Sequence, residues 1–181
     1  MFMFISFYLT NDIYHNGDIG RYRKRLIRLE IPLIVWNLIY ALIVILEGNS
    51  ISASDFFGGL IWGHGAGLDT PLWFLSSQIL ITFFVFSLFL AVEGKKRVPV
   101  SFIIIILVFV MEYTGTITTW FETANSDYKY TIAYAFESIP YALSGMMFKN
   151  LESSISKISR TWIYILTWII ASLGGFYVAR G

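Results

Sequence analysis

Long apolar stretches alternate with short polar connectors along this chain. A helix needs about 20 residues to cross a hydrocarbon core of roughly 30 Å, and most of the stretches approach that length. They run from about Glu30 to Leu46, Pro71 to Val92, Pro99 to Tyr113, Tyr130 to Phe148 and Thr161 to Ala179. The pattern predicts an all-α fold, a polytopic transmembrane helical bundle with about five full spans.

The N-terminal segment, residues 1–9, is apolar but shorter than a span. Nine residues make only about 14 Å of helix. No basic residue precedes this segment and no small-residue cleavage site follows it, so a signal peptide is a poor interpretation. We expect a partial helix whose earlier part lies outside the chain, and the final VARG also stops at the end of a span. Residues 1–181 are therefore expected to be a single membrane domain, a fragment of a larger one.

Composition supports membrane insertion. The chain is 56% hydrophobic and 18% aromatic, and its mean hydropathy is +0.66, more apolar than a soluble domain of this length can bury. The net charge of +1 argues against a nucleic-acid partner. Because the sequence has no cysteine, it can form no disulfide, thiolate nucleophile or cysteine-based metal site.

The cations gather in alternate connectors, which gives a topology. Eleven of the 13 precede the first span, follow the second or follow the fourth. These are Arg21, Arg23, Lys24, Arg25 and Arg28; Lys95, Lys96 and Arg97; and Lys149, Lys157 and Arg160. Because cytoplasmic loops retain Lys and Arg, we predict a multi-pass protein of the plasma or inner membrane with its basic loops cytoplasmic and the lipid bilayer as its surroundings.

Three of the first five cations have helical spacing. Arg21, Arg25 and Arg28 stand at i, i+4 and i+7, so a helix would align their guanidinium groups on one face. A planar guanidinium can donate two hydrogen bonds to one phosphate group, which favours an anionic ligand. The alternative is that the cluster only orients the chain at the cytoplasmic surface.

A polar stripe follows the predicted fourth span, where ionisable side chains are costly. Its members recur at intervals of 4, 3, 4 and 3 residues and are Tyr130, Tyr134, Glu137, Tyr141 and Ser144. The stripe indicates either hydrogen bonding between helices or a polar cavity. Gln78 is expected at a depth similar to that of Glu137, roughly 10 Å below the outer surface, and could face the same cavity. Trp73, near that surface, could stack on a sugar or anchor the helix at the interface.

The two histidines, His15 and His64, are 49 positions apart in predicted connectors. Neither has a second histidine at helical spacing, so we expect solvated side chains and no metal site. A local pair of His64 with Asp69 is the functional alternative.

Several motifs occur together in a recognisable order. FISFYL is similar to an F-x-x-S-G-Y-L helix end, RLIR to an R-x-x-R pair, and Pro32 then opens the next helix. TPLWFLSSQILITFF and IPYALSGMMF follow, similar to an H-L-W-F-L or W-S-L-x-x-E helix and to a P-Y-F-L-x-G helix. In this order the motifs resemble the integral-membrane acyltransferase 3 family. One departure is Phe7, which stands where that family usually has glycine.

The resemblance implies a membrane-bound O-acyltransferase. Such an enzyme would move an acyl group, expected to be acetyl, from cytoplasmic acyl-CoA to a hydroxyl of a sugar or surface polysaccharide. Acyl-CoA would be a co-substrate, with no resident cofactor. Arg21, Arg25 and Arg28 would bind this donor. The acceptor-side candidates are Trp73, Gln78, Tyr134 and Glu137.

The resemblance also implies that the catalytic histidine lies upstream of this chain. Neither His15 nor His64 matches that motif, so the catalytic residue is unassigned and this fragment is predicted to be inactive alone. The alternative interpretation is a non-catalytic part of a transporter or a membrane scaffold.

Overall fold

The computed structural model describes residues 2–63, 72–117, 119 and 129–152. The chain divides into two compact units, Met1–Met147 and Phe148–Gly181. The features below belong to the first unit.

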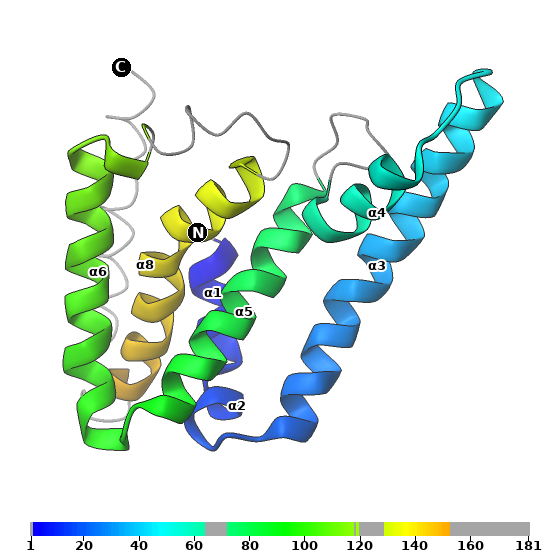
Figure 1. Cartoon of the computed structure of the whole chain (residues 1–181). Helices are drawn as coiled ribbons and strands as arrows, with labels where there is room; N and C mark the ends of the chain where they lie inside the picture. Colours follow the sequence, from blue (N-terminus) through cyan, green and yellow to red (C-terminus); the bar gives the residue numbers. More distant parts are fainter. Residues whose placement is uncertain (1, 64–71, 118, 120–128, 153–181) are drawn as a thin grey trace. The chain divides into compact units, whose positions relative to one another are not determined.

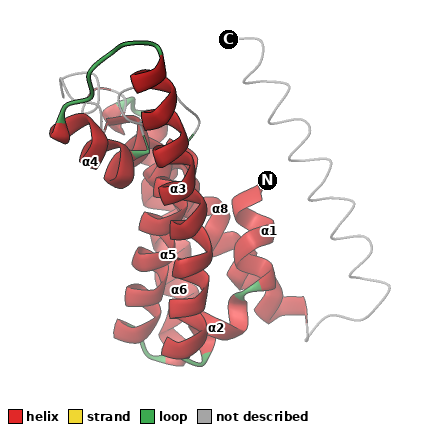
Figure 2. Ribbon diagram, turned by 90° about the vertical axis from the view of Figure 1, so that its right-hand side faces the viewer, coloured by secondary structure: helices red, strands yellow, loops and turns green. Residues whose placement is uncertain are grey.

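Every regular element of the described residues is a helix (Figures 1 and 2). In chain order these are α1 (Phe2–Leu9), α2 (Asn11–His15), α3 (Ile19–Leu46), α4 (Ala53–Trp62), α5 (Trp73–Ala91), the 3₁₀ helix η1 (Gly94–Lys96), α6 (Arg97–Tyr113) and α8 (Lys129–Glu152). The predicted all-α class is confirmed for the described part of the chain.

Two of these helices, α3 with 28 residues and α5 with 19, are long and apolar enough to cross a membrane. The predicted third and fourth spans are also helical, as α6 and α8, but they do not meet the same combination of length and hydropathy. The predicted fifth span, 161–179, lies outside the described residues. The count of about five spans is therefore not confirmed.

Helix α3 begins well before the apolar stretch that revealed it. Asp18 caps its N-terminus by accepting a hydrogen bond from the backbone N–H of Arg21 at 2.9 Å. The expectation that Pro32 opens the helix is wrong, because Pro32 lies inside α3. The basic segment before it consists largely of good helix formers, and a proline inside a long helix removes only one backbone hydrogen bond. The arginine cluster and the apolar span thus share one continuous helix.

Helix α1 packs closely against α8 at Gly145. A Cβ atom on Gly145 would overlap the carbonyl oxygen of Phe4, so only glycine permits this approach. Phe7, which replaces the glycine of the resembled motif, is fully buried in the same core beside Tyr14. The glycine that lets α1 and α8 approach closely is therefore Gly145 of α8, and not a glycine of α1.

A second close approach positions α4. Gly63 ends α4 in the left-handed conformation with φ of 77°. A side chain there would overlap the backbone of Leu72, at the start of α5. This glycine brings the end of α4 against the first turn of α5.

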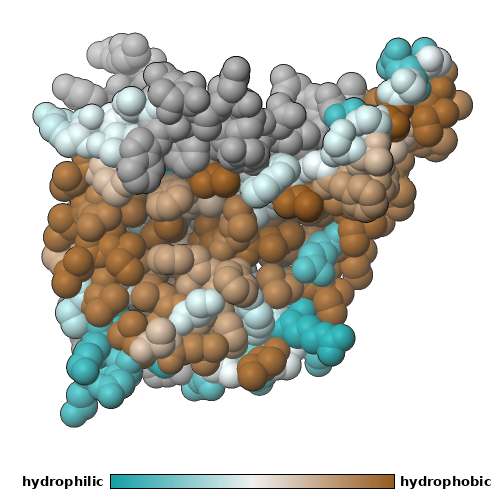
Figure 3. All heavy atoms as spheres, in the orientation of Figure 1, coloured by the Kyte–Doolittle hydropathy of each residue, from teal (hydrophilic) through white to brown (hydrophobic). Residues whose placement is uncertain are grey.

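The exterior of the described helices is largely apolar. Figure 3 shows brown, hydrophobic spheres over much of the visible face, with hydrophilic residues in its lower part and at its upper right end. Large apolar side chains such as Leu42 and Ile45 on α3, Phe83 on α5, and Ile103 and Leu107 on α6 are more than half exposed. A hydrocarbon solvent suits such a surface better than water does.

Candidate functional site

The three arginines with helical spacing lie on α3 in different environments. Arg21 is exposed and forms an ion pair with Asp18 at 3.2 Å. Arg28 is also exposed, whereas Arg25 is only partly exposed and turns towards the interior. Of the three predicted donor-binding residues, only Arg25 is partly buried between helices; Arg21 and Arg28 are exposed.

The guanidinium of Arg25 joins three helices. It donates to the Ser6 hydroxyl at 2.9 Å and the Ser6 carbonyl at 3.4 Å, to the Thr10 hydroxyl, and to the Thr82 hydroxyl at 3.4 Å. Its carbon Cζ lies 4.8 Å from the centre of the Phe7 ring, in the range of a cation–π contact. All these partners are neutral, and no ion pair of Arg25 is present within the described residues. Its positive charge has no carboxylate partner there.

Gln78, predicted for the acceptor side, meets Arg25 through one hydroxyl group. Its side-chain amide donates to the Ser6 Oγ at 3.0 Å, and this is the oxygen that also accepts from Arg25. Gln78 is 1% exposed, and among the described atoms its Oε1 has no hydrogen-bond partner. A buried amide oxygen is therefore open to a donor at this point.

Tyr14 closes the group on the α2 side. Its ring lies 5.7 Å from Arg25 Cζ, and its side chain is almost fully buried. Burial raises the pKa of the Tyr14 phenol above its ordinary value, although the positive charge of Arg25 and the neighbouring Thr82 and Thr10 hydroxyl groups act in the opposite direction. The phenol is consequently neutral at physiological pH. Below, the Arg25 network means Ser6, Thr10, Tyr14, Arg25, Gln78 and Thr82.

A cavity of about 300 Å³ lies between α1, α5 and α8. The residues lining it are Phe2, Met3, Trp73, Phe74, Ser77, Tyr134, Ser138 and Tyr141. The rings of Trp73 and Tyr134 stack in its wall, with centroids 4.0 Å apart and planes 19° from parallel. Two of the four predicted acceptor-side residues thus meet here, in what we call the aromatic cavity.

The aromatic cavity and the Arg25 network are consecutive along two helices. On α1, Met3 lines the cavity and Ser6 follows about one turn later. On α5, Ser77 lines the cavity and donates to the Thr131 carbonyl at 2.8 Å, while Gln78 turns to Ser6. The adjacent α5 residues Ser77 and Gln78 therefore belong to the aromatic cavity and to the Arg25 network, respectively.

Glu137 lies elsewhere on α8. It is half-buried and does not line the aromatic cavity, and the charge that interacts with it belongs to Glu112 of α6. Within its predicted stripe, Tyr134 and Tyr141 face the cavity and Glu137 does not. Neither Gln78 nor Glu137 lines the aromatic cavity.

Neither region includes a histidine among the described residues. His15 is the last residue of α2, and His64 lies outside the described residues. In the ranges that the structure describes, no group of three or more His, Asp or Glu side chains could hold a metal ion.

Sequence reasoning missed Ser6, Thr10, Tyr14 and Thr82 as members of a site. Their signal was present as spacing, because Ser6 and Thr10, and likewise Gln78 and Thr82, are polar pairs four residues apart in apolar surroundings. Such pairs place two polar groups on one helix face. Spacing alone cannot predict that these polar faces of α1 and α5 both contact Arg25 of α3.

A family model described as an acyltransferase domain matches the chain over residues 1–181. Neither the curated proteins nor the solved structures give a match.

Proposed function

The chain belongs to the acyltransferase 3 family, and on that premise we propose that it supplies donor-side and acceptor-side helices of a membrane O-acyltransferase. The acyl group, which we take to be acetyl, moves from cytoplasmic acyl-CoA to a hydroxyl of a sugar or surface polysaccharide. The acceptor oxygen forms a bond to the thioester carbonyl carbon, the carbon–sulfur bond breaks, and the hydroxyl proton passes through a general base to the departing thiolate.

The observation that supports this proposal best is the shared Ser6 hydroxyl. It accepts hydrogen bonds from Arg25 and from Gln78, which we predict to serve opposite sides of the reaction. The aromatic cavity begins about one helical turn away on α1. A donor held by the arginines and an acceptor in the cavity would therefore lie close together.

The donor side of the proposal rests on the charge of Arg25. Four hydrogen bonds use its N–H groups, so a fifth N–H is left for a ligand. Arg28 lies about one turn further along α3 and is exposed. A phosphate group of coenzyme A would supply the negative charge that no described carboxylate gives to Arg25. Arg21 extends the same helix face towards the start of α3.

The acceptor side rests on the aromatic cavity. Its volume is at the lower end of the roughly 300–1,000 Å³ of ordinary ligand pockets. Trp73 and Tyr134 offer aromatic surface, and Ser77 and Ser138 offer hydroxyl groups, a combination that suits a sugar. Gln78 orients a hydroxyl but cannot act as a base. Glu137 does not line this cavity, so it would contact only an acceptor that extends beyond the cavity.

The membrane topology is part of the proposal. The start of α3 and the connection from α5 to α6 lie at one end of the unit (Figure 1), and both are rich in cations. This arrangement supports a multi-pass protein of the plasma or inner membrane with these basic segments on the cytoplasmic side, where acyl-CoA is available.

A binding measurement on matched arginines tests the donor site. In the 181-residue chain in lipid nanodiscs, Arg28→Gln should weaken acetyl-CoA binding about tenfold, the loss of one charged hydrogen-bonding partner. Arg23→Gln is the control, because Arg23 is exposed on α3 but lies off the face shared by Arg21, Arg25 and Arg28. Equal affinities for both variants and the unaltered chain would favour the alternative function, a non-catalytic scaffold or transporter part in which Arg25 only joins helices.

No residue of this chain matches the catalytic histidine of the resembled motif. We therefore expect the purified 181-residue chain to bind acetyl-CoA without transferring its acetyl group. Transfer of labelled acetyl from acetyl-CoA to an added polysaccharide by this chain alone would contradict that expectation.

A further inference from the structure

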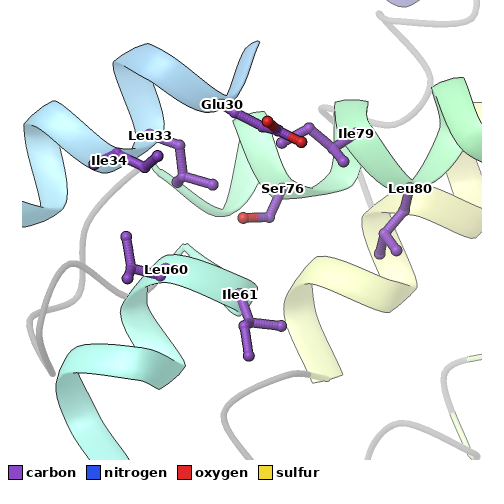
Figure 4. A pocket seen from close by; sticks show the side chains of 8 residues that line it. All are labelled: Glu30, Leu33, Ile34, Leu60, Ile61, Ser76, Ile79 and Leu80. Atoms are coloured by element: carbon purple, nitrogen blue, oxygen red, sulfur yellow. The ribbon is translucent and has the colours of Figure 1, made fainter. Parts of the chain in front are cut away.

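A second cavity, of about 390 Å³, lies between α3, α4 and α5. Its lining residues are Glu30, Leu33, Ile34, Leu60, Ile61, Ser76, Ile79 and Leu80 (Figure 4). Six of the eight are leucine or isoleucine, and only Glu30 and Ser76 are polar. It includes no member of the Arg25 network or the aromatic cavity, and we call it the Glu30 cavity.

Within the described residues, neither polar group of this cavity has a hydrogen-bond or ion-pair partner; Ser76 is buried, whereas Glu30 is exposed. Ser76 is 2% exposed, and within the described residues its hydroxyl makes no hydrogen bond. Glu30 follows the start of α3 by eleven residues, about 16 Å of helix, and forms no ion pair with any described cation. A buried hydroxyl left unpaired costs roughly 1–3 kcal/mol, so such a group usually has a partner that the protein itself does not supply.

We propose that the Glu30 cavity binds a long-chain aliphatic alcohol, or the alcohol end of a larger single-chain amphiphile. The hydrocarbon chain packs against the leucine and isoleucine side chains. The hydroxyl group donates a hydrogen bond to the Glu30 carboxylate and accepts one from the Ser76 hydroxyl. This site is independent of the proposed acyl transfer.

The pair of polar groups selects a hydroxyl over other head groups. A carboxylate only accepts, whereas the Ser76 hydroxyl has a proton to donate, so the matching group must be both donor and acceptor. An alkyl ammonium has no acceptor and would leave the Ser76 proton unpaired. A plain hydrocarbon, such as a lipid tail, would leave the buried Ser76 hydroxyl unpaired in an apolar cavity and give the Glu30 carboxylate no donor.

Photolabelling with two matched probes tests the proposal. The 181-residue chain, in phosphatidylcholine nanodiscs, is exposed to dodecanol carrying a mid-chain diazirine, or to dodecane carrying the same group. Labelled residues are mapped by mass spectrometry. We expect the alcohol to reach half-maximal labelling of the cavity residues at about one tenth of the hydrocarbon concentration, the effect of satisfying these polar groups.

Variants separate the polar groups from the cavity itself. Glu30→Leu and Ser76→Ala should each remove most of the preference for the alcohol, whereas Glu47→Leu and Ser87→Ala, at exposed positions of the same α3–α5 region, should retain it. Ile61→Trp should fill the cavity and block labelling by both probes, and because Ile61 is 59% exposed the substitution is compatible with folding.

Three outcomes would overturn the proposal. Equal labelling by the two probes would mean that an ordinary lipid tail covers an apolar groove. An alcohol preference that persists in both Glu30→Leu and Ser76→Ala would place the alcohol elsewhere. Absence of label from the cavity residues, in a chain that remains monodisperse by size exclusion, would mean that another part of the protein fills the space.

Discussion

The Arg25 network and the aromatic cavity lie next to each other on α1 and α5, yet they are built in opposite ways. In the network polar side chains mostly bond to one another, because Arg25 of α3 hydrogen-bonds to Ser6 of α1, to Thr10 and to Thr82 of α5, and shares the Ser6 hydroxyl with Gln78. The cavity has room, with the Trp73–Tyr134 stack forming part of its wall. Polar side chains in apolar helices can therefore either form hydrogen bonds between helices or line a cavity. The residues that face them on the adjacent helices determine which of the two occurs.

The largest expected effect comes from removing the centre of the network. Arg25→Ala should destabilise the protein by about 2–4 kcal/mol, because it leaves several hydroxyl groups of α1 and α5 without their donor. The measurement is the free energy of unfolding in detergent, with exposed Arg23→Ala as the control. A loss below about 0.5 kcal/mol would mean that the network does not hold the helices together, and that Arg25 is retained for ligand binding alone.

A substitution at Gly145 affects both regions at once. Gly145→Val should cost about 1–3 kcal/mol, because a side chain there pushes α1 away from α8 and strains a filled core. Thermal unfolding in nanodiscs gives the effect. Gly58→Val on α4 is the matched control, since a Cβ there meets open space. Equal melting temperatures for the two variants would contradict the close α1–α8 contact.

Ser6→Ala separates Arg25 from Gln78 with the least change in volume. We expect a loss of about 1–2 kcal/mol, since two hydrogen bonds end at this hydroxyl. A double-mutant cycle with Gln78→Leu isolates the coupling between these positions. Additive effects would show that Ser6 does not link the two predicted sides of the reaction.

The smallest effect on stability is expected at the cavity. Trp73→Ala should leave acetyl-CoA affinity unchanged and weaken binding of an oligosaccharide acceptor about tenfold, because it removes aromatic surface that a sugar can stack on. Saturation-transfer NMR measures binding of the oligosaccharide, and calorimetry measures the affinity for acetyl-CoA. Leu90→Ala, at an exposed position of the same helix, is the control. Unchanged oligosaccharide binding would favour the alternative, in which Trp73 only anchors the helix at the membrane interface.

Local pattern predicted the helices well. The apolar stretches beginning near Pro71, Pro99 and Tyr130 match α5, α6 and α8 to within a few residues. The start of α3 was missed because hydropathy reports only the apolar part of a helix, whereas capping by Asp18 and helix propensity set its true beginning. Pro32 was misplaced for the same reason.

By itself, the sequence determined that the described part of the chain is helical, that its cations gather near alternate ends of the apolar stretches, and that Arg21, Arg25 and Arg28 share a face of one helix. These properties depend on residues a few positions apart, so periodicity and charge reveal them. Only the tertiary structure decided that Arg25 turns inward, that Gln78 meets it at Ser6, and that Trp73 stacks on Tyr134 in a cavity that Glu137 does not line. Those outcomes depend on which helix packs against which face, and contacts between residues as far apart as Ser6 and Gln78 leave no trace in local spacing.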